Sequence, residues 1–160
     1  MWGSLLSGGH ATYCGTVTFE PYDGALRGIQ GYFDAVHSGK LTGAQDFRVL
    51  HAFFNDTGLN LIGFEPDDGL AGNRPEQVKS MRRDKTVILY LANPDGDTPK
   101  TDDVCETIPE ISLNLGPCTA RWFDPRSGSW HGPNTHPAGS TPFTAPDGGD
   151  WVLLLEMQDQ

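Results

Sequence analysis

The segment Cys118–Trp130 restricts the fold most, because it predicts a β-hairpin. Two strand-like stretches flank Asp124–Gly128, where a proline presets φ for a turn and Gly128 supplies the positive φ of the turn exit. Near the end of the chain, Gly149–Glu156 contains the apolar run Trp-Val-Leu-Leu-Leu, which predicts a buried closing strand. Both features indicate antiparallel β-structure.

Two earlier segments repeat the strand signal. Residues 78–83 and 86–92 predict strands joined through Asp84-Lys85, and the continuous apolar run of the second is typical of a strand buried on both faces. With 20 Gly and 12 Pro, the composition also favours turns and short strands over long helices.

Residues 111–115 alternate apolar and polar side chains, as a half-buried strand does, whereas residues 132–139 are rich in Gly, Pro and His and predict a connection. We therefore predict a mainly β fold with a two-sheet antiparallel sandwich over residues 78–157. The predicted core includes Val87, Leu89, Leu113, Leu115, Trp122, Val152 and Leu154.

Two helices are predicted before the sandwich. Apolar side chains recur at helical spacing over residues 26–36, before a glycine that ends the pattern. Residues 42–58 begin with a capping box, carry Phe47, Leu50 and Phe54 on one face and end at a glycine. Both apolar stripes need a surface to cover them.

The charge excludes two classes of partner. A formal net charge of −10 opposes binding to nucleic acid or to an anionic membrane, and no apolar run approaches the roughly 20 residues of a membrane span. The N-terminus lacks the basic region of a secretory signal. Two interpretations stay open: a cytoplasmic product, or a piece of a longer secreted or periplasmic protein in which Met1 is internal.

Three cysteines leave the compartment open. Cys105 and Cys118 could form a disulfide under oxidising conditions, although free, half-buried thiols are favoured for all three, including Cys14. Their spacing predicts no zinc site.

The hairpin and the closing strand resemble the C-terminal β-sandwich of a group of apiosidase-like and endoglucanase-like glycoside hydrolases. In that group an Ala-Arg-Trp-Tyr/Phe-Asp-Pro-Arg-x-Gly hairpin precedes a terminal Asp-Trp-Val-Leu strand, and Ala120–Gly128 and Asp150–Leu153 match both motifs. The sandwich carries the label of a collagen-binding domain, which no residue of this chain supports. The resemblance implies that residues 1–57 are the end of a (β/α)8 barrel with connector helices, and that residues 58–160 are an accessory sandwich.

The same resemblance assigns the N-terminal loop to the mouth of the barrel. Leu5-Leu6 predicts a short apolar strand, and the following loop keeps His10 and Tyr13 of a Gly-Gly-x-Gly-His-x-Tyr-Gly motif. These two side chains are implied to contact a sugar.

The hairpin also carries candidate polar and aromatic groups. Asp124 is expected to accept a backbone N–H at the turn, and Arg121 and Arg126 are expected to pair with it, the alternative being a sugar acid. Among the tryptophans, Trp122 and Trp151 are expected in the core. Trp130 is the candidate platform for a sugar ring.

No catalytic pair or strong metal site is predicted. Most acids lie in turn clusters, and the histidines 131 and 136 lack a third ligand. No cofactor is expected, apart from Ca²⁺ as a weak alternative at Asp95, Asp97 and Asp102, whose spacing fits no EF-hand loop.

The leading hypothesis is a non-catalytic accessory region that supports a carbohydrate-cleaving barrel in the parent protein, so that the chain alone is inactive. The alternative is a stand-alone carbohydrate-binding sandwich, and a weaker one is an independent enzyme. The apolar helix faces also predict a homodimer through the N-terminal region.

Overall fold

The computed structural model describes residues 1–9, 43–72, 77–92 and 110–158. Its helices are α1 (Trp2–Leu6), α3 (Gly43–Thr57) and the 3₁₀ helix η2 (Asp68–Ala71). Its strands are β1 (Glu65–Pro66), β2 (Val78–Arg83), β3 (Thr86–Leu91), β4 (Glu110–Leu115), β5 (Cys118–Phe123), β6 (Trp130–His136), β7 (Gly139–Thr144) and β8 (Trp151–Met157).

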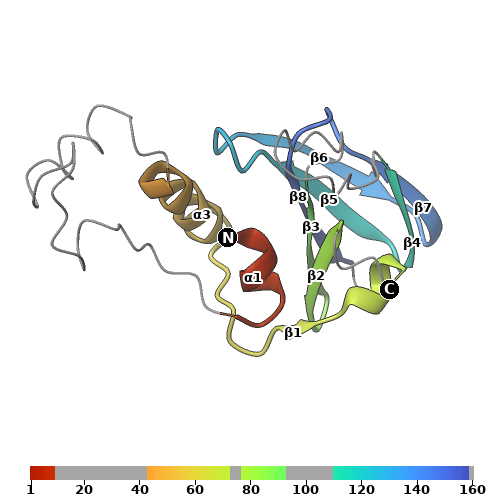
Figure 1. Cartoon of the computed structure of the whole chain (residues 1–160). Coiled ribbons are helices and arrows are strands. Elements are labelled where there is room, and N and C mark those ends of the chain that lie inside the picture. The colour runs from red at the N-terminus through yellow and green to blue at the C-terminus, as the bar shows by residue number, and fades with distance from the viewer. Residues whose placement is uncertain (10–42, 73–76, 93–109, 159–160) are drawn as a thin grey trace, which may run out of the picture.

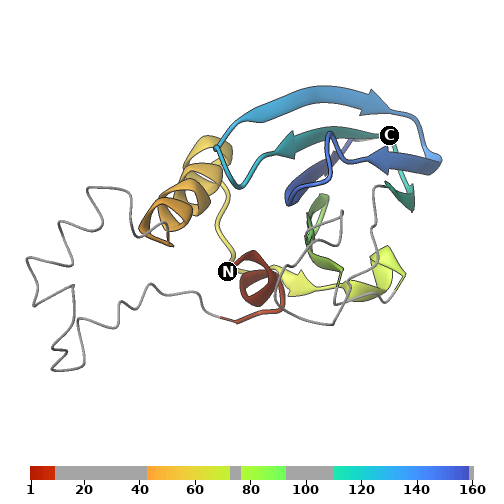
Figure 2. The ribbon, with the colours of Figure 1, turned by 45° about the horizontal axis from the view of Figure 1, so that its top comes forward.

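The elements form three layers. A six-stranded antiparallel sheet in the order β1-β2-β3-β8-β5-β6 lies in the middle, the two-stranded sheet β4-β7 covers one face, and α1 and α3 lie on the other (Figures 1 and 2). This arrangement confirms the predicted mainly β, antiparallel fold. No described helix is long and apolar enough to cross a membrane.

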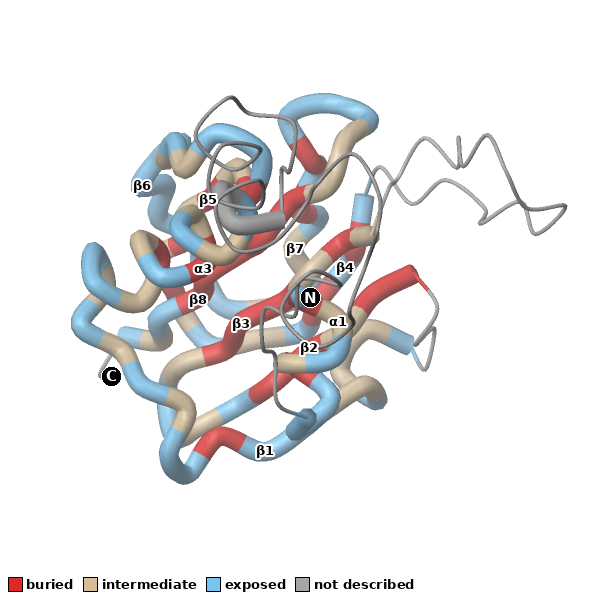
Figure 3. Tube along the Cα trace, turned by 60° about the vertical axis from the view of Figure 1, so that its left-hand side comes forward, coloured by how far each residue is buried: buried red, intermediate tan, exposed pale blue. Residues whose placement is uncertain are grey.

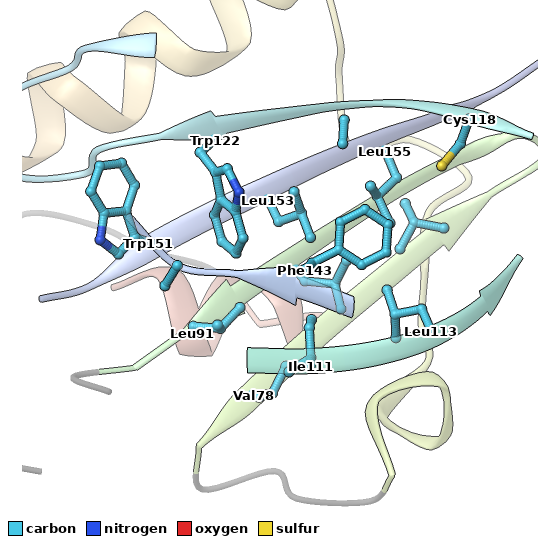
Figure 4. Packing of buried hydrophobic residues seen from close by; sticks show 14 residues of the cluster. Val78, Leu91, Ile111, Leu113, Cys118, Trp122, Phe143, Trp151, Leu153 and Leu155 are labelled. Carbon is cyan, nitrogen blue, oxygen red and sulfur yellow. The ribbon is translucent and has the colours of Figure 1, made fainter. Parts of the chain in front are cut away.

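The first core lies between the two sheets. It contains Val87 and Leu89 from β3, Leu113 from β4 and the packed indoles of Trp122 and Trp151, whose ring centroids are 6.2 Å apart (Figure 4). Alternation explains this membership, because every second residue of a strand faces the same side of its sheet. The predicted burial of Trp122 and Trp151 is confirmed.

The second core lies between the six-stranded sheet and the two helices. It includes Ile88, Val152 and Leu154, which alternate with residues of the first core, together with Trp2 and Phe53 from the helices. The central strands are therefore buried on both faces (Figure 3), as predicted for residues 86–92. Val152 and Leu154 are buried as predicted, but they lie in the core under the helices and not in the core between the sheets.

The N-terminal residues form a helix, and the predicted strand at Leu5-Leu6 is wrong. In α1 the amide of Leu5 donates to the carbonyl of Met1, and that of Ser7 donates to Gly3, both at 3.1 Å. Helical spacing puts Trp2 and Leu6 on one buried face. Packing of those two side chains stabilises a helix too short to persist alone.

The second predicted helix is confirmed by α3, which ends directly before Gly58. Its Leu50 and Phe53 are buried against the sheet. The helix predicted over residues 26–36 and the capping residue Thr42 lie outside the described residues.

Two strands differ from the prediction. The stretch 132–139 was expected to be a connection, but β6 extends to His136 and β7 follows at once. Pro133 and Pro142 concealed these strands, since proline cannot donate to a ladder and is tolerated only at edges. Within the described residues both strands are edges, because β6 pairs only with β5 and β7 only with β4.

Candidate functional site

The turn between β5 and β6 is held by a network centred on Arg126. Asp124 Oδ1 accepts hydrogen bonds from the backbone N–H and the Nε–H of Arg126, both at 2.8 Å. The Nη2 of the same guanidinium donates to Asp147 at 2.9 Å. The predicted Asx turn and the Asp124–Arg126 ion pair are therefore present. Gly128, with φ of 81°, closes the turn.

Asp147 joins this turn to the start of β8. Its Oδ1 accepts the indole N–H of Trp151 and the backbone N–H of Gly149, both at 2.8 Å. The hydrogen bonds from Arg126, Gly149 and Trp151 lower the pKa of Asp147 to about 2. A Cβ on Gly149 would lie 1.9 Å from Nη1 of Arg126, so this position has no room for a side chain unless the guanidinium moves.

The pKa of Asp124 responds to opposing effects. Its partial burial raises the pKa, but the hydrogen bonds from the side chain and backbone of Arg126 outweigh it, and the net pKa is lowered. Both carboxylates beside Arg126 are thus held ionised.

Beside this network lies a cleft of about 400 Å³, the polar cleft. Its walls come from both helices, the end of β3, the β5–β6 turn and the residue before β8. It is lined by Met1, Trp2, Asp46, Tyr90, Pro125, Arg126 and Asp150.

One hydrogen bond orders the floor of the polar cleft. The hydroxyl of Tyr90 donates to Asp150 Oδ2 at 2.7 Å. Burial, and then this hydrogen bond, raise the pKa of Tyr90, so the phenol stays protonated. Pro125, Arg126 and Asp150 belong to the two sequence motifs, but Asp46 and Tyr90 did not stand out in the sequence, because they belong to separate elements that only the fold brings together.

Arg121 and Trp130, the two remaining candidates of the hairpin, lie on the helix side of the six-stranded sheet. Arg121 was expected to pair with Asp124, but it pairs with Glu156 at 3.2 Å, because β5 and β8 are neighbouring strands. Its guanidinium also lies 4.9 Å from the ring centroid of Trp130.

Trp130 is packed between the sheet and α3. Its ring stacks on Phe53, with a centroid separation of 5.4 Å and an interplanar angle of 23°, and its indole N–H donates to Asp56 at 3.0 Å. These contacts tie β6 to α3. A role for Trp130 in sugar binding stays a prediction.

The other predicted site residues lie outside the described residues: His10 and Tyr13, and the calcium candidates Asp95, Asp97 and Asp102. Within the described ranges no three metal-binding side chains gather at a site. Cys118 is a buried free thiol, and burial raises its pKa.

A second hollow, the helix groove, lies between the helices and the loop after α3. Its volume is about 330 Å³ and most of its lining is apolar. The residues that line it are Leu5, Phe47, Leu50, His51, Phe54, Leu59, Asn60 and Leu61. The neighbouring Ile62 is 82% exposed.

The sandwich can be compared with known families. The family described as "Putative collagen-binding domain of a collagenase" matches residues 66–156, from β1 to β8. The chain belongs to this family. The predicted resemblance is thereby confirmed for the sandwich. A comparison with curated proteins finds no match.

Solved structures share the fold of this family member. A protein titled "Glycoside hydrolase" has a TM-score of 0.59 at 15% identity, over 89% of this chain and 31% of its own. A glycoside hydrolase family 5 protein from Bacteroides vulgatus ATCC 8482 has a TM-score of 0.53 at 15% identity, over 72% of this chain and 24% of its own. The present chain thus spans about a third or a quarter of these proteins.

Proposed function

We propose that this chain is the non-catalytic C-terminal accessory region of a glycoside hydrolase-like protein, in which it supports a carbohydrate-cleaving barrel. One observation carries the proposal. The structural match to the protein titled "Glycoside hydrolase" covers 89% of this chain but only 31% of that protein. Because residues 66–160 make up less than two thirds of the chain, that match also includes residues before β1. The shared fold therefore contains more than the sandwich.

The helix groove gives this proposal a physical basis. It is an apolar hollow on the helix side, away from β4 and β7, and apolar surface of this kind is typical of an interface. In the proposed arrangement, residues 1–57 form the end of the barrel and its connector, and residues 58–160 form the accessory domain.

The activity of the isolated chain tests the non-catalytic role. Purified protein is expected to release no nitrophenol above the blank from a panel of 4-nitrophenyl glycosides, since glycoside hydrolysis needs two carboxylates placed across the scissile bond. Release that disappears in Asp46→Asn or Asp150→Asn would contradict the proposal, because these carboxylates line the polar cleft. The DNA upstream of the Met1 codon gives a second test, with the remainder of an in-frame barrel of roughly 250 residues as the expected result.

The helix groove also predicts self-association of the isolated chain. Without a barrel to cover it, we expect dimers in multi-angle light scattering as the concentration rises. Phe47→Ser should weaken the dimer, because Phe47 lines the groove and is only half-buried. Glu65→Gln, an exposed change on β1, is the control. A strict monomer at high concentration would contradict this prediction.

A second candidate function is carbohydrate binding by the chain itself. The polar cleft favours it, because its volume lies within the roughly 300–1,000 Å³ of small-molecule sites and its walls carry both hydrogen-bond donors and acceptors.

A further inference from the structure

The polar cleft presents donors and acceptors from different elements. Asp46 lies in the first turn of α3, Asp150 directly precedes β8, and Arg126 lies in the β5–β6 turn. A carboxylate only accepts hydrogen bonds and a guanidinium only donates them. The Tyr90 hydroxyl donates to Asp150 and keeps lone pairs that can accept.

Arg126 retains donors for a ligand. Its Nε and Nη2 are occupied by Asp124 and Asp147, whereas its Nη1 has no hydrogen-bond partner among the described residues. The two carboxylates fix the plane of the guanidinium, and its carbon lies 5.2 Å from the ring centroid of Trp151. The remaining N–H groups are therefore held in place before a ligand arrives, which lowers the entropy cost of binding.

The charge of the cleft selects against anions. Its charged side chains are two carboxylates and one guanidinium, and that guanidinium is already paired with both Asp124 and Asp147. An anionic ligand would approach a surface with excess negative charge. This argues against the sugar acid that the sequence left open for Arg126.

Neighbouring hydroxyl groups fit this arrangement, because each can donate to a carboxylate or to the Tyr90 oxygen and can accept from a guanidinium. We propose that the polar cleft binds the hydroxyl groups of a neutral carbohydrate, with Asp46 and Asp150 as acceptors and Arg126 as donor. This inference rests on the second candidate function, carbohydrate binding, and is independent of the accessory role.

Nitrogen-edited NMR of the full chain tests this proposal. The probes are the methyl glycosides of glucose, galactose, xylose and arabinose, with glucuronate as the anionic comparison, each added to about 50 mM, which detects weak millimolar binding. The indole N–H of Trp2 reports on the cleft, and that of Trp130, bonded to Asp56, reports on a site outside it. We expect at least one neutral glycoside to shift the Trp2 signal saturably, with no shift from glucuronate.

Two variants and a control assign the effect to the cleft. Asp46→Asn and Tyr90→Phe should each raise the Kd about fivefold or more, since Asn replaces a charged acceptor oxygen with a donor and Phe lacks the hydroxyl oxygen that can accept from the ligand. Glu65→Gln should leave the Kd unchanged. An unchanged Trp130 signal in each variant, before ligand is added, shows that the fold is intact.

Three results would overturn the proposal: no saturable shift with any neutral glycoside, tighter binding of glucuronate, or an unchanged Kd in both cleft variants. Glycoside shifts that map away from Trp2 would also overturn the assignment to the cleft, while leaving carbohydrate binding by the chain in place. None of these results bears on the hydrolysis test. Failure of the accessory role can therefore be distinguished from failure of carbohydrate binding in the polar cleft.

Discussion

At the scale of single residues, Arg126 shows how one side chain fixes the relation between a turn and a strand. Its guanidinium bridges Asp124 in the β5–β6 turn and Asp147 before β8. Both carboxylates have lowered pKa values, which means that the folded state favours their ionised forms.

The pH dependence of stability should report on Asp147. Its pKa is lowered from 3.8 to about 2, so its contribution to stability is present above pH 3.8 and is lost as the pH falls toward 2. Asp147→Asn removes the charge but keeps an oxygen that can accept from Gly149 and Trp151. In urea unfolding, the wild type should therefore be more stable than the variant at about pH 6, and this difference should shrink toward about pH 2. An equal difference at both pH values would show that the charge of Asp147 does not act through Arg126.

At the scale of elements, Trp130 connects the edge strand β6 to α3. Its ring stacks on Phe53, and its N–H donates to Asp56 near the end of the helix. The contact joins segments far apart in the sequence, so it helps to hold α3 on the sheet.

A double-mutant cycle should measure this connection. Trp130→Phe keeps an aromatic ring but loses the N–H, and Asp56→Ala removes the acceptor. We expect a coupling energy of about 1 kcal/mol, together with faster amide hydrogen exchange in α3. Additive effects of the two changes, with unaltered exchange, would mean that the hydrogen bond does not hold the helix. Asp46→Asn, at the opposite end of α3, is the control.

At the scale of the whole molecule, the two cores share their central strands. Leu153 and Leu155 of β8 face the β4-β7 sheet, whereas Val152 and Leu154 face the helices. Loss of either core therefore removes support from the same strand. We expect the described parts of the chain to unfold as one cooperative unit.

Trp2→Ala tests this coupling. The Trp2 side chain is 6% exposed and contacts Phe53 and Phe123, so the change should cost about 3 kcal/mol. Near-ultraviolet circular dichroism, sensitive to the Trp122–Trp151 pair, and far-ultraviolet circular dichroism should give one shared, shifted transition. A first transition that leaves the near-ultraviolet signal intact would show that the helices unfold separately. Leu5→Ala, a half-buried neighbour, should have a smaller effect.

The sequence by itself determined the elements whose signals are local. The run 86–92, the turn 124–128 and the stripe of α3 follow from side-chain period and turn chemistry, which need no distant partner. The sequence did not predict the helix α1 or the strand β7. A five-residue helix and a proline-containing edge strand are stable only through the surfaces they cover, as Trp2 in the second core shows.

Only the tertiary structure decided which face each side chain occupies and which polar groups meet. The apolar run predicted that β8 is buried, but the helices, and not a second sheet, cover Val152. Likewise, Asp46, Tyr90 and Asp150 form one cleft although they belong to different elements. No local pattern encodes such a meeting, because it depends on strand order and on how α3 packs across the sheet.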